Sequence, residues 1–382
     1  MNSVVNPLHP SGRIAASPSP ALPDAFPATD LLAWFDRSSR AMPWRRDRDP
    51  WRIWVSEAML QQTLVATVIP FFERFVARFP DPAALARTDE QEALRYWEGL
   101  GYYRRIRHLR QAAILVVERH RGEVPDTLEA FAALPGVGRY MAGAVLSQAF
   151  EARLPVLEAN TRRVLCRLFA VAEDPAKPAT QKVLWAHAEA ILPTQRIGDF
   201  NQAMMELGAL VCTVSNPACD RCPLSPVCRS HREGLTGSIP APSAKATLTE
   251  VREVALVVRR DRQVLLVQRP EGGRWAGMWE FPHCEVAADG DPHLQAIDSL
   301  KALTGLTGRS VGEYGLIRHG VTRYKIEMHC FEIRADEGEF ASAFYVSHRW
   351  LTPDELSGVA LSSAQRTLAG KLAGGPSQPG LF

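Results

Sequence analysis

Four of the seven cysteines in this 382-residue chain fall in one short segment. Cys212, Cys219, Cys222 and Cys228 follow the order C-x6-C-x2-C-x5-C, and this crowding needs a chemical cause. Two disulfides are one candidate, but the proline-rich N-terminal segment shows no signal-peptide pattern, which favours a reducing compartment where thiolates bind metal. Zinc and an iron–sulfur cluster both accept four thiolates, so the spacing alone leaves these two open. The remaining cysteines are expected to be packing residues: Cys166, Cys284 and Cys330.

Two glutamates stand where a carboxylate could do acid–base chemistry. Glu57 lies in the otherwise apolar segment 54–63, where burial would raise its pKa toward that of a general acid. The alternative is an ordinary solvated helix residue. Glu158 immediately precedes a predicted helix, whose dipole favours a negative group at that end. It is either a functional carboxylate or only a helix cap.

Two loops have compositions suited to contacts with phosphates and bases. Gly136, Val137 and Gly138 form a G-x-G turn between helical runs, which would expose backbone N–H groups at a helix N-terminus and bind phosphate. An ordinary tight turn is the alternative. Residues 99–105 combine glycines with tyrosines and arginines, which suits stacking and charge pairing together. The alternative here is a core tyrosine, Tyr102, followed by a solvated arginine face.

Helices are predicted to hold these residues in the first part of the chain. From Leu31 to about Arg232, apolar residues recur at spacings of three and four, as in segments 83–97, 128–134 and 200–211. Helix caps are predicted at Asp81-Pro82 and at Asp126-Thr127. The fold class of this part is therefore all-α.

Strands are predicted after a linker rich in Gly, Ser, Pro and Ala. Segments 254–258 and 264–267 flank a polar Arg-Asp-Arg turn, and apolar residues alternate with polar ones from Tyr324 to Cys330. A capping box at Thr352 predicts a later helix, so this part is α+β. The predicted divisions are an N-terminal tail 1–28, a helical domain 29–232, a linker 233–250, an α+β domain 251–370 and a C-terminal tail 371–382.

The bulk composition is that of a globular protein. Hydrophobic residues make up 46% and charged residues 23% of the chain, and the net charge of +2 does not by itself indicate a nucleic-acid partner. No apolar run approaches the ~20 residues that span a bilayer. We therefore expect a soluble, cytoplasmic protein without a membrane partner.

These motifs together resemble those of helix-hairpin-helix DNA glycosylases of the endonuclease III superfamily, and within it the MutY-type adenine DNA glycosylases. The resemblance is carried by the 6-2-5 cysteine order, the hairpin 134–138, the segment 54–63 and, in the second half, residues 269–270 and 275–282. It extends from about Leu31 to Leu356. It implies a six-helix barrel module and a cluster module with a [4Fe-4S] cofactor on the four cysteines, joined to a Nudix-like domain.

The resemblance implies a role for each glutamate. Glu57 would protonate N7 of adenine, and Glu158 would stabilise the oxocarbenium-like state formed as the N-glycosidic bond breaks. The usual aspartate-glycine-asparagine of the family is replaced here by Glu158-Ala159-Asn160, which lengthens the carboxylate side chain by one methylene. Asn160 matches the family and would orient this region.

Tyr140 implies the type of reaction. Bifunctional members of the superfamily carry at this point a lysine that forms a Schiff base and cuts the strand, so tyrosine implies hydrolysis alone. Tyr140 also matches a residue of the catalytic pocket in some MutY-type enzymes. The other matches to the adenine pocket are Trp44, Arg45, Leu60, Val65 and Gln202.

The resemblance also implies contacts with DNA. The hairpin 136–138 would grip the backbone, while Gln62 and Tyr102 would act as wedges in the gap left by a flipped base. In the family a Phe-Ser-His loop reads the oxidised guanine; this chain keeps only a hydroxyl there, at Thr322. Residues 297–303 lack the glutamate-rich helix with which Nudix hydrolases hold magnesium, so recognition rather than nucleotide hydrolysis is implied.

The expected function is that of a monofunctional adenine DNA glycosylase in base excision repair. It would flip adenine mispaired with 8-oxoguanine or guanine out of double-stranded DNA and hydrolyse its N-glycosidic bond, acting as a monomer associated with the nucleoid. Two alternatives remain open. A bifunctional pyrimidine glycosylase and lyase would nick DNA, which Tyr140 argues against, and a lesion-binding protein would release no base, which the substitution at Glu158 keeps open.

Overall fold

The computed structural model describes residues 26–241, 247–287, 289–321, 323–336 and 338–374. The chain divides into two compact units. One contains the chain up to Ser39 together with Leu157–Pro193 and Ala203–Pro242, and the other contains Arg40–Val156, Thr194–Gln202 and the chain from Ser243 onward. Thr322, a predicted DNA contact, lies outside the described residues, as do most of both predicted tails. Within the described ranges, no helix is long and apolar enough to cross a membrane.

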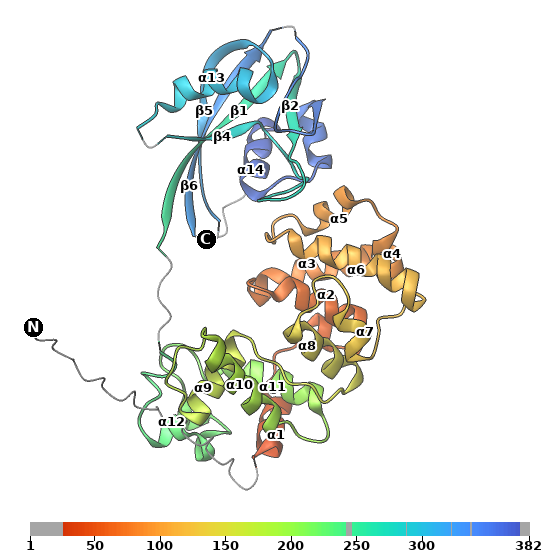
Figure 1. Ribbon diagram of the computed structural model, residues 1–382, viewed down its shortest axis with the longest axis vertical. Coiled ribbons are helices and arrows are strands. Elements are labelled where there is room, and N and C mark those ends of the chain that lie inside the picture. Colours follow the sequence, from red (N-terminus) through yellow and green to blue (C-terminus); the bar gives the residue numbers. More distant parts are fainter. Residues whose placement is uncertain (1–25, 242–246, 288, 322, 337, 375–382) are drawn as a thin grey trace, which may run out of the picture. The chain divides into compact units, whose positions relative to one another are not determined.

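The first part of the chain is helical, as predicted (Figure 1). Its α-helices are α1 Ala28–Ser38, α2 Pro50–Leu60, α3 Val65–Arg78, α4 Pro82–Ala86, α5 Glu90–Trp97, α6 Arg104–His120, α7 Leu128–Ala132, α8 Arg139–Phe150, α9 Ala159–Phe169, α10 Pro178–Ala190, α11 Ile197–Leu210 and α12 Arg229–Arg232. Short 3-10 helices are η1 Pro43–Arg45, η2 Cys219–Arg221 and η3 Ser225–Val227.

Side-chain caps set where several of these helices begin. Asp81 caps α4, as predicted, by accepting a hydrogen bond from the Ala84 N–H at 2.7 Å. The predicted continuous run 83–97 is instead two helices, because Asp89 caps α5 by accepting from the Glu92 N–H at 2.8 Å. Of the predicted pair Asp126-Thr127, it is Thr127 that caps α7, by accepting from the Ala130 N–H at 3.4 Å.

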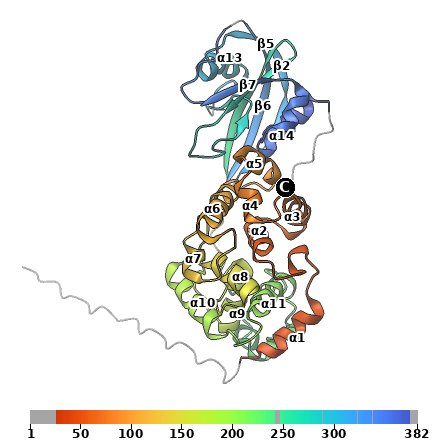
Figure 2. The same cartoon turned by 90° about the vertical axis from the view of Figure 1, so that its right-hand side faces the viewer.

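The helices of residues 40–156 enclose a core rich in aromatic side chains. Phe72 and Phe75 of α3 and Trp97 of α5 are fully buried. Trp54 of α2 meets Phe131 of α7 edge to face, with ring centroids 4.8 Å apart. Helix α2 lies beside α8 in both views (Figures 1 and 2). Since α2 has neighbours on several sides, its polar residues Ser56 and Glu57 are buried as well.

The second part is a mixed β-sheet with helices, again as predicted. Its strands are β1 Thr249–Arg260, β2 Gln263–Gln268, β3 Trp279–Glu280, β4 His283–Val286, β5 Gly308–Val321, β6 Tyr324–Ala335 and β7 Ser347–Leu351. The strand order is β3-β2-β1-β6-β5, with β4 paired to β1 and β7 to β2. Strands β1 and β6 run parallel, and the other pairs run antiparallel.

Both faces of β1 are buried, each under a different helix (Figure 1). Val254 and Leu256 pack in the core that includes Leu300 of α13 Pro292–Thr304. The alternating residue Val257 packs in the core that includes Leu368 of α14 Ser363–Leu372. The capping box at Thr352 is present, but it begins a 3-10 helix, η4 Pro353–Gly358, and α14 follows separately.

Candidate functional site

Glu57 is a buried carboxylate with two side-chain hydrogen-bond donors. It lies on α2 and is 4% exposed. Its Oε2 accepts a hydrogen bond from the Tyr140 hydroxyl at 2.6 Å, and its Oε1 accepts one from Nε2 of Gln148 at 3.0 Å. Both donors belong to α8. The alternative of a solvated helix residue is therefore wrong, and the carboxyl group is held in one orientation.

Hydrogen bonds with side chains fix both ends of α2, the helix that carries Glu57. Asp49 caps the helix by accepting from the Trp51 and Arg52 N–H groups at 2.8 and 3.1 Å. At the other end Arg105 donates from Nη1 to the carbonyl oxygens of Ala58 and Met59. These contacts satisfy polar groups that helix ends leave without partners inside the helix.

Gln148 was not identified in the sequence. It stands eight positions after Tyr140 on α8, and two turns of an α-helix bring such residues to the same face. The helical period was the signal that could have found it, once Tyr140 was taken as a site residue. Gln148 is 6% exposed, so its amide is committed to the interior.

Glu158, in the other compact unit, is the N-cap of α9. Its two carboxylate oxygens accept from the Asn160 and Thr161 N–H groups, each at 2.8 Å. The Thr161 hydroxyl accepts in return from the Glu158 N–H, also at 2.8 Å, which completes a capping box. Burial raises the pKa of Glu158, and these two backbone donors oppose that rise. Glu158 therefore caps α9, and its role as a functional carboxylate stays a prediction.

Asn160 is tied to the segment that carries the first cysteine of the cluster motif. Its Oδ1 accepts from Nη2 of Arg163 at 2.8 Å, while Nε of Arg163 donates to the Cys212 carbonyl oxygen at 2.7 Å. The same Nη2 donates to the Gly208 carbonyl oxygen at 2.7 Å. A Cβ atom on Gly208 would come within 2.6 Å of the Asn160 Cβ, so glycine is needed for this close packing. Sequence reasoning missed Arg163.

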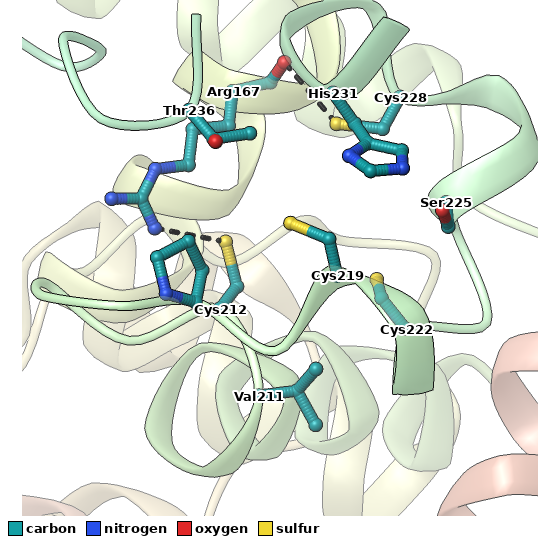
Figure 3. A pocket seen from close by; sticks show the side chains of 10 residues that line it. Arg167, Val211, Cys212, Cys219, Cys222, Ser225, Cys228, His231 and Thr236 are labelled. Carbon is teal, nitrogen blue, oxygen red and sulfur yellow. Dashed lines mark hydrogen bonds between the residues drawn. The ribbon is translucent and has the colours of Figure 1, made fainter. Parts of the chain in front are cut away.

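The four cysteines of the motif line one pocket (Figure 3). All seven cysteines lie in the described ranges and carry free thiols. Across those ranges, no three or more His, Cys, Asp or Glu side chains are grouped so that they could hold a metal ion. Burial raises the pKa of Cys222 to about 12, and the neighbouring cysteines raise it as well. Four thiolates therefore need a compensating positive charge to share this pocket.

Arg167 of α9 is a cation at the edge of this pocket (Figure 3). Its side chain is almost fully buried, and Nη1 donates to Cys212 Sγ at 3.4 Å and to the Thr213 carbonyl oxygen at 2.6 Å. Nη2 donates to the Val214 carbonyl oxygen at 3.1 Å. From the other side, the Cys228 thiol donates to the main-chain oxygen of Arg167 at 3.5 Å. Arg167 thus fixes both ends of the cysteine motif.

A separate cavity brings the predicted DNA-contact residues together. Gln62, Tyr102 and Gly136, which come from three different loops, all line it. Tyr102 is 45% exposed, so the reading as a core tyrosine is wrong. The cavity also carries two basic groups of α6, Arg104 and His108. A surface with aromatic, amide and cationic side chains around one hollow can bind bases and phosphate together.

The glycine hairpin uses its two glycines differently. Gly136 has φ +78°, and a Cβ atom added to it would lie 2.7 Å from the His108 Cβ. Both the positive φ and the contact with His108 therefore require glycine. Gly138 has φ −97°, is the N-cap of α8 without a side-chain cap bond, and has open space around its Cβ position. The predicted turn is therefore made by Gly136 alone, whereas Gly138 leaves the α8 N-terminus open to a ligand.

Three of the five predicted adenine-pocket residues share one hydrophobic cluster: Trp44 is buried in it, and Leu60 and Val65 pack against it. Trp44 is 4% exposed and packs edge to face against Phe72 in the helical core. Arg45 donates from Nη1 to the Arg40 carbonyl oxygen at 3.1 Å. The others are half-buried: Leu60, Val65 and Gln202. Their roles toward adenine stay predictions.

In the sheet domain, the Arg318-His319 pair lies near the end of β5. Arg318 is exposed and its Nε donates to Glu327 at 2.7 Å. His319 is half-buried beside Trp275, with ring centroids 6.3 Å apart. Burial lowers the pKa of His319 to about 4, so its ring is neutral at neutral pH. Helix α13 carries the region 297–303 without a glutamate-rich face.

Two family models match the chain. The model described as HhH-GPD superfamily base excision DNA repair protein matches residues 55–189, and the NUDIX domain model matches residues 253–371. The first match contains Glu57, Tyr140 and Glu158. The second contains all the strands from β2 to β7 and most of β1.

Two relatives and one solved structure are also similar to this chain. The adenine DNA glycosylase of Rattus norvegicus is 34% identical over 391 residues, which cover 88% of this chain and 76% of the relative. The adenine DNA glycosylase of Homo sapiens is 33% identical over 397 residues, which cover 88% and 72%. The structure of a thermostable thymine-DNA glycosylase matches with TM-score 0.50 and 28% identity, covering 54% of this chain and 95% of that one.

The two hairpin glycines predict unequal effects of an added methyl group. Gly136→Ala should lower the free energy of unfolding by about 1–3 kcal/mol, because alanine is strained at this positive φ and its Cβ meets His108. Gly138→Ala should cost less, about 0.5–1 kcal/mol, because alanine is a poorer N-cap residue than glycine but its Cβ meets open space here. Denaturant unfolding of both variants checks this. Equal effects would show that the turn does not depend on the left-handed residue.

Proposed function

The chain belongs to the adenine DNA glycosylase family, and we propose that Glu57 is the acid of its reaction. It is a DNA N-glycosylase of base excision repair. The observation that carries the assignment is the buried carboxyl group with its two donors, Tyr140 and Gln148. Burial excludes water from the proton, and the donors fix the direction in which it is delivered. Protonation of adenine at N7 turns the base into a neutral leaving group.

The bond that breaks joins adenine to C1′ of the deoxyribose. Its electron pair leaves with the protonated base, and the sugar passes through an oxocarbenium-like state before water adds to C1′. Tyr140 cannot form a Schiff base, because it has no amine. We therefore propose that the product is an intact strand with an abasic site.

We further propose that Glu158 carries the negative charge that stabilises the oxocarbenium-like state. Its support is the burial of the side chain and its fixed position at the N-terminus of α9. One observation favours a second candidate, a lesion-binding protein that releases no base. Both carboxylate oxygens of Glu158 are already engaged by backbone N–H groups. An assay of adenine release will decide between a glycosylase and a lesion-binding protein.

The proposed substrate is double-stranded DNA with adenine opposite 8-oxoguanine or guanine, bound by a monomer. The cavity lined by Gln62, Tyr102 and Gly136 supports a contact at the flipped base, where a wedge fills the stack and backbone N–H groups of the hairpin hold phosphate. Lesion reading by Thr322 and association with the nucleoid remain parts of the proposal that rest on the sequence alone.

The four cysteines line one pocket and follow the 6-2-5 order by which the chain resembles the endonuclease III superfamily. Four thiolates suit zinc as well as a [4Fe-4S] cluster, and it is the resemblance that favours the cluster. We propose that Cys212, Cys219, Cys222 and Cys228 hold such a cluster, which stabilises this part of the fold.

Substitution of the proposed acid tests the function directly. Glu57→Gln should lower the rate of adenine release from an A:8-oxoguanine duplex by at least ~100-fold while DNA binding is retained, since general acid catalysis contributes about 10²–10⁴. Release is measured as alkali-sensitive sites, with untreated samples to detect nicking. Glu73→Gln, on the exposed side of α3, is the matched control.

Wild-type protein that binds the mispair but releases no base would establish the second candidate instead. Nicking without alkali, or activity on thymine glycol in place of adenine, would establish a bifunctional enzyme. Normal turnover by Glu57→Gln would mean that the acid is another residue.

A shorter carboxylate at position 158 should be tolerated. Glu158→Asp should keep or raise the rate of adenine release, because aspartate retains the charge and is a good N-cap. Glu158→Ala removes both and should lower the rate and the stability. Single-turnover rates and thermal unfolding separate the two effects. Complete loss of activity in Glu158→Asp would show that the site depends on the longer side chain.

Metal analysis tests the cofactor. Purified protein should contain about four iron atoms and four acid-labile sulfides per chain. Replacement of Cys222 by serine should lower both contents together with thermal stability. One zinc ion per chain, without sulfide, would contradict the proposal.

A further inference from the structure

Two residues that line the same cavity adopt a backbone conformation that is rare for residues with a side chain. Gln62 has φ 59° and Tyr102 has φ 47°, both in the left-handed region. Such a conformation is unfavourable without glycine and persists only where surrounding contacts hold it. Neither loop has a glycine at this position, so other groups must hold both of them.

One side chain donates to the backbone just before Gln62. Nη1 of Arg105 donates to the carbonyl oxygens of Ala58, Met59 and Gln61 at 3.0, 2.7 and 2.6 Å. Nη2 donates to the Thr63 hydroxyl at 3.3 Å. Arg105 therefore binds the loop on both sides of its left-handed residue.

The same guanidinium holds the second loop. Nη2 donates to the carbonyl oxygens of Leu100 and Gly101, each at 3.1 Å, and Nε donates to the Tyr102 carbonyl oxygen at 3.4 Å. Its central carbon lies 5.4 Å from the Trp97 ring centroid and 5.5 Å from the Tyr102 ring centroid. Arg105 thus stacks on the ring of one wedge residue while it fixes the backbone of both.

The geometry needs arginine rather than any cation. A guanidinium directs several N–H groups in a rigid plane, whereas a lysine ammonium donates from a single point. Burial lowers the pKa of Arg105 to about 10, so the group is still charged at neutral pH. Its neighbour Arg104 is exposed and donates from Nε to His108, which leaves other N–H groups of Arg104 free to meet phosphate.

We propose that Arg105 is a positioning residue that locks Gln62 and Tyr102 into one rigid wedge for base extrusion. The inference rests on the proposed function for the role of the wedge. Because the donors of Arg105 are directed at protein oxygens, it acts without touching DNA. Its loss should therefore impair flipping more than it impairs attachment to the duplex.

The first experiment uses the free protein. Hydrogen exchange of residues 61–63 and 100–103 is compared between wild type, Arg105→Lys and the matched control Arg110→Lys. Arg110 lies on the same helix and donates from Nε and Nη2 to the Thr88 carbonyl oxygen, at 2.9 and 2.7 Å. Arg105→Lys should speed exchange about 10-fold or more in both loops, since each loses its anchor. Arg110→Lys should leave both loops unchanged.

The second experiment measures extrusion with 2-aminopurine placed opposite 8-oxoguanine. Arg105→Lys should lose about 10-fold in the flipping equilibrium, read as fluorescence, while the salt dependence of binding stays that of wild type. Arg110→Lys should behave as wild type. If the salt slope falls by about one in the charge-removing variant Arg105→Gln, Arg105 is a phosphate contact and the proposal is overturned.

If hydrogen exchange in Arg105→Lys changes in only one of the two loops or in neither, the proposal that Arg105 locks both loops is also overturned. If Arg105→Lys fails to fold, Thr63→Val replaces it, because this variant removes one acceptor of Arg105 and, besides that, only the long bond from the Thr63 hydroxyl to the Gln61 carbonyl oxygen at 3.5 Å. It should speed exchange in residues 61–63 and leave 100–103 unchanged, and no change in 61–63 would count against the lock. Wild type that releases no adenine would overturn the proposed function alone, since the exchange experiment needs no DNA.

Discussion

Buried arginines that donate to main-chain carbonyl oxygens hold the functional loops of this protein together. A helix leaves its last carbonyl groups without an N–H partner, and a loop near a ligand site cannot satisfy its own polar groups by regular structure. Arg105 supplies N–H donors to carbonyl oxygens of the loops around Gln62 and Tyr102. Arg163 and Arg167 supply such donors to the cysteine segment. Helix α2, which carries Glu57, depends on the same kind of contact, because its last carbonyl oxygens accept from Arg105.

This use of arginine explains why net charge says little about the partner. The chain has 44 Lys+Arg against 42 Asp+Glu. Several of its cations face inward, and Arg167 is 3% exposed. A guanidinium is suited to this because it is weakly hydrated and offers several directed donors, so each carbonyl oxygen it meets offsets part of the cost of burial. Arg104, by contrast, is exposed.

The sequence predicted the architecture better than the contacts inside it. Helical and strand periods predicted the helical part and the sheet part, since such patterns follow from which faces are buried. The break at Asp89 was missed because apolar spacing continues across it, and only its cap bond shows the new start. Gln148 and Arg163 were missed because their partners, Glu57 and the Cys212 carbonyl oxygen, lie far away in sequence. Such pairings depend on packing that no local pattern records.

The parallel pairing of β1 with β6 affects how the protein folds during its synthesis. Residue Thr249 pairs with Tyr324 and Arg259 with Arg334, so the central ladder joins segments separated by most of the domain. Pairings of this kind carry a large loop-closure entropy and form slowly. During synthesis β1 emerges well before its partner, with apolar residues on both faces. The sheet can close only after the ribosome has released β6, whereas α2 through α8 already have their packing partners by then.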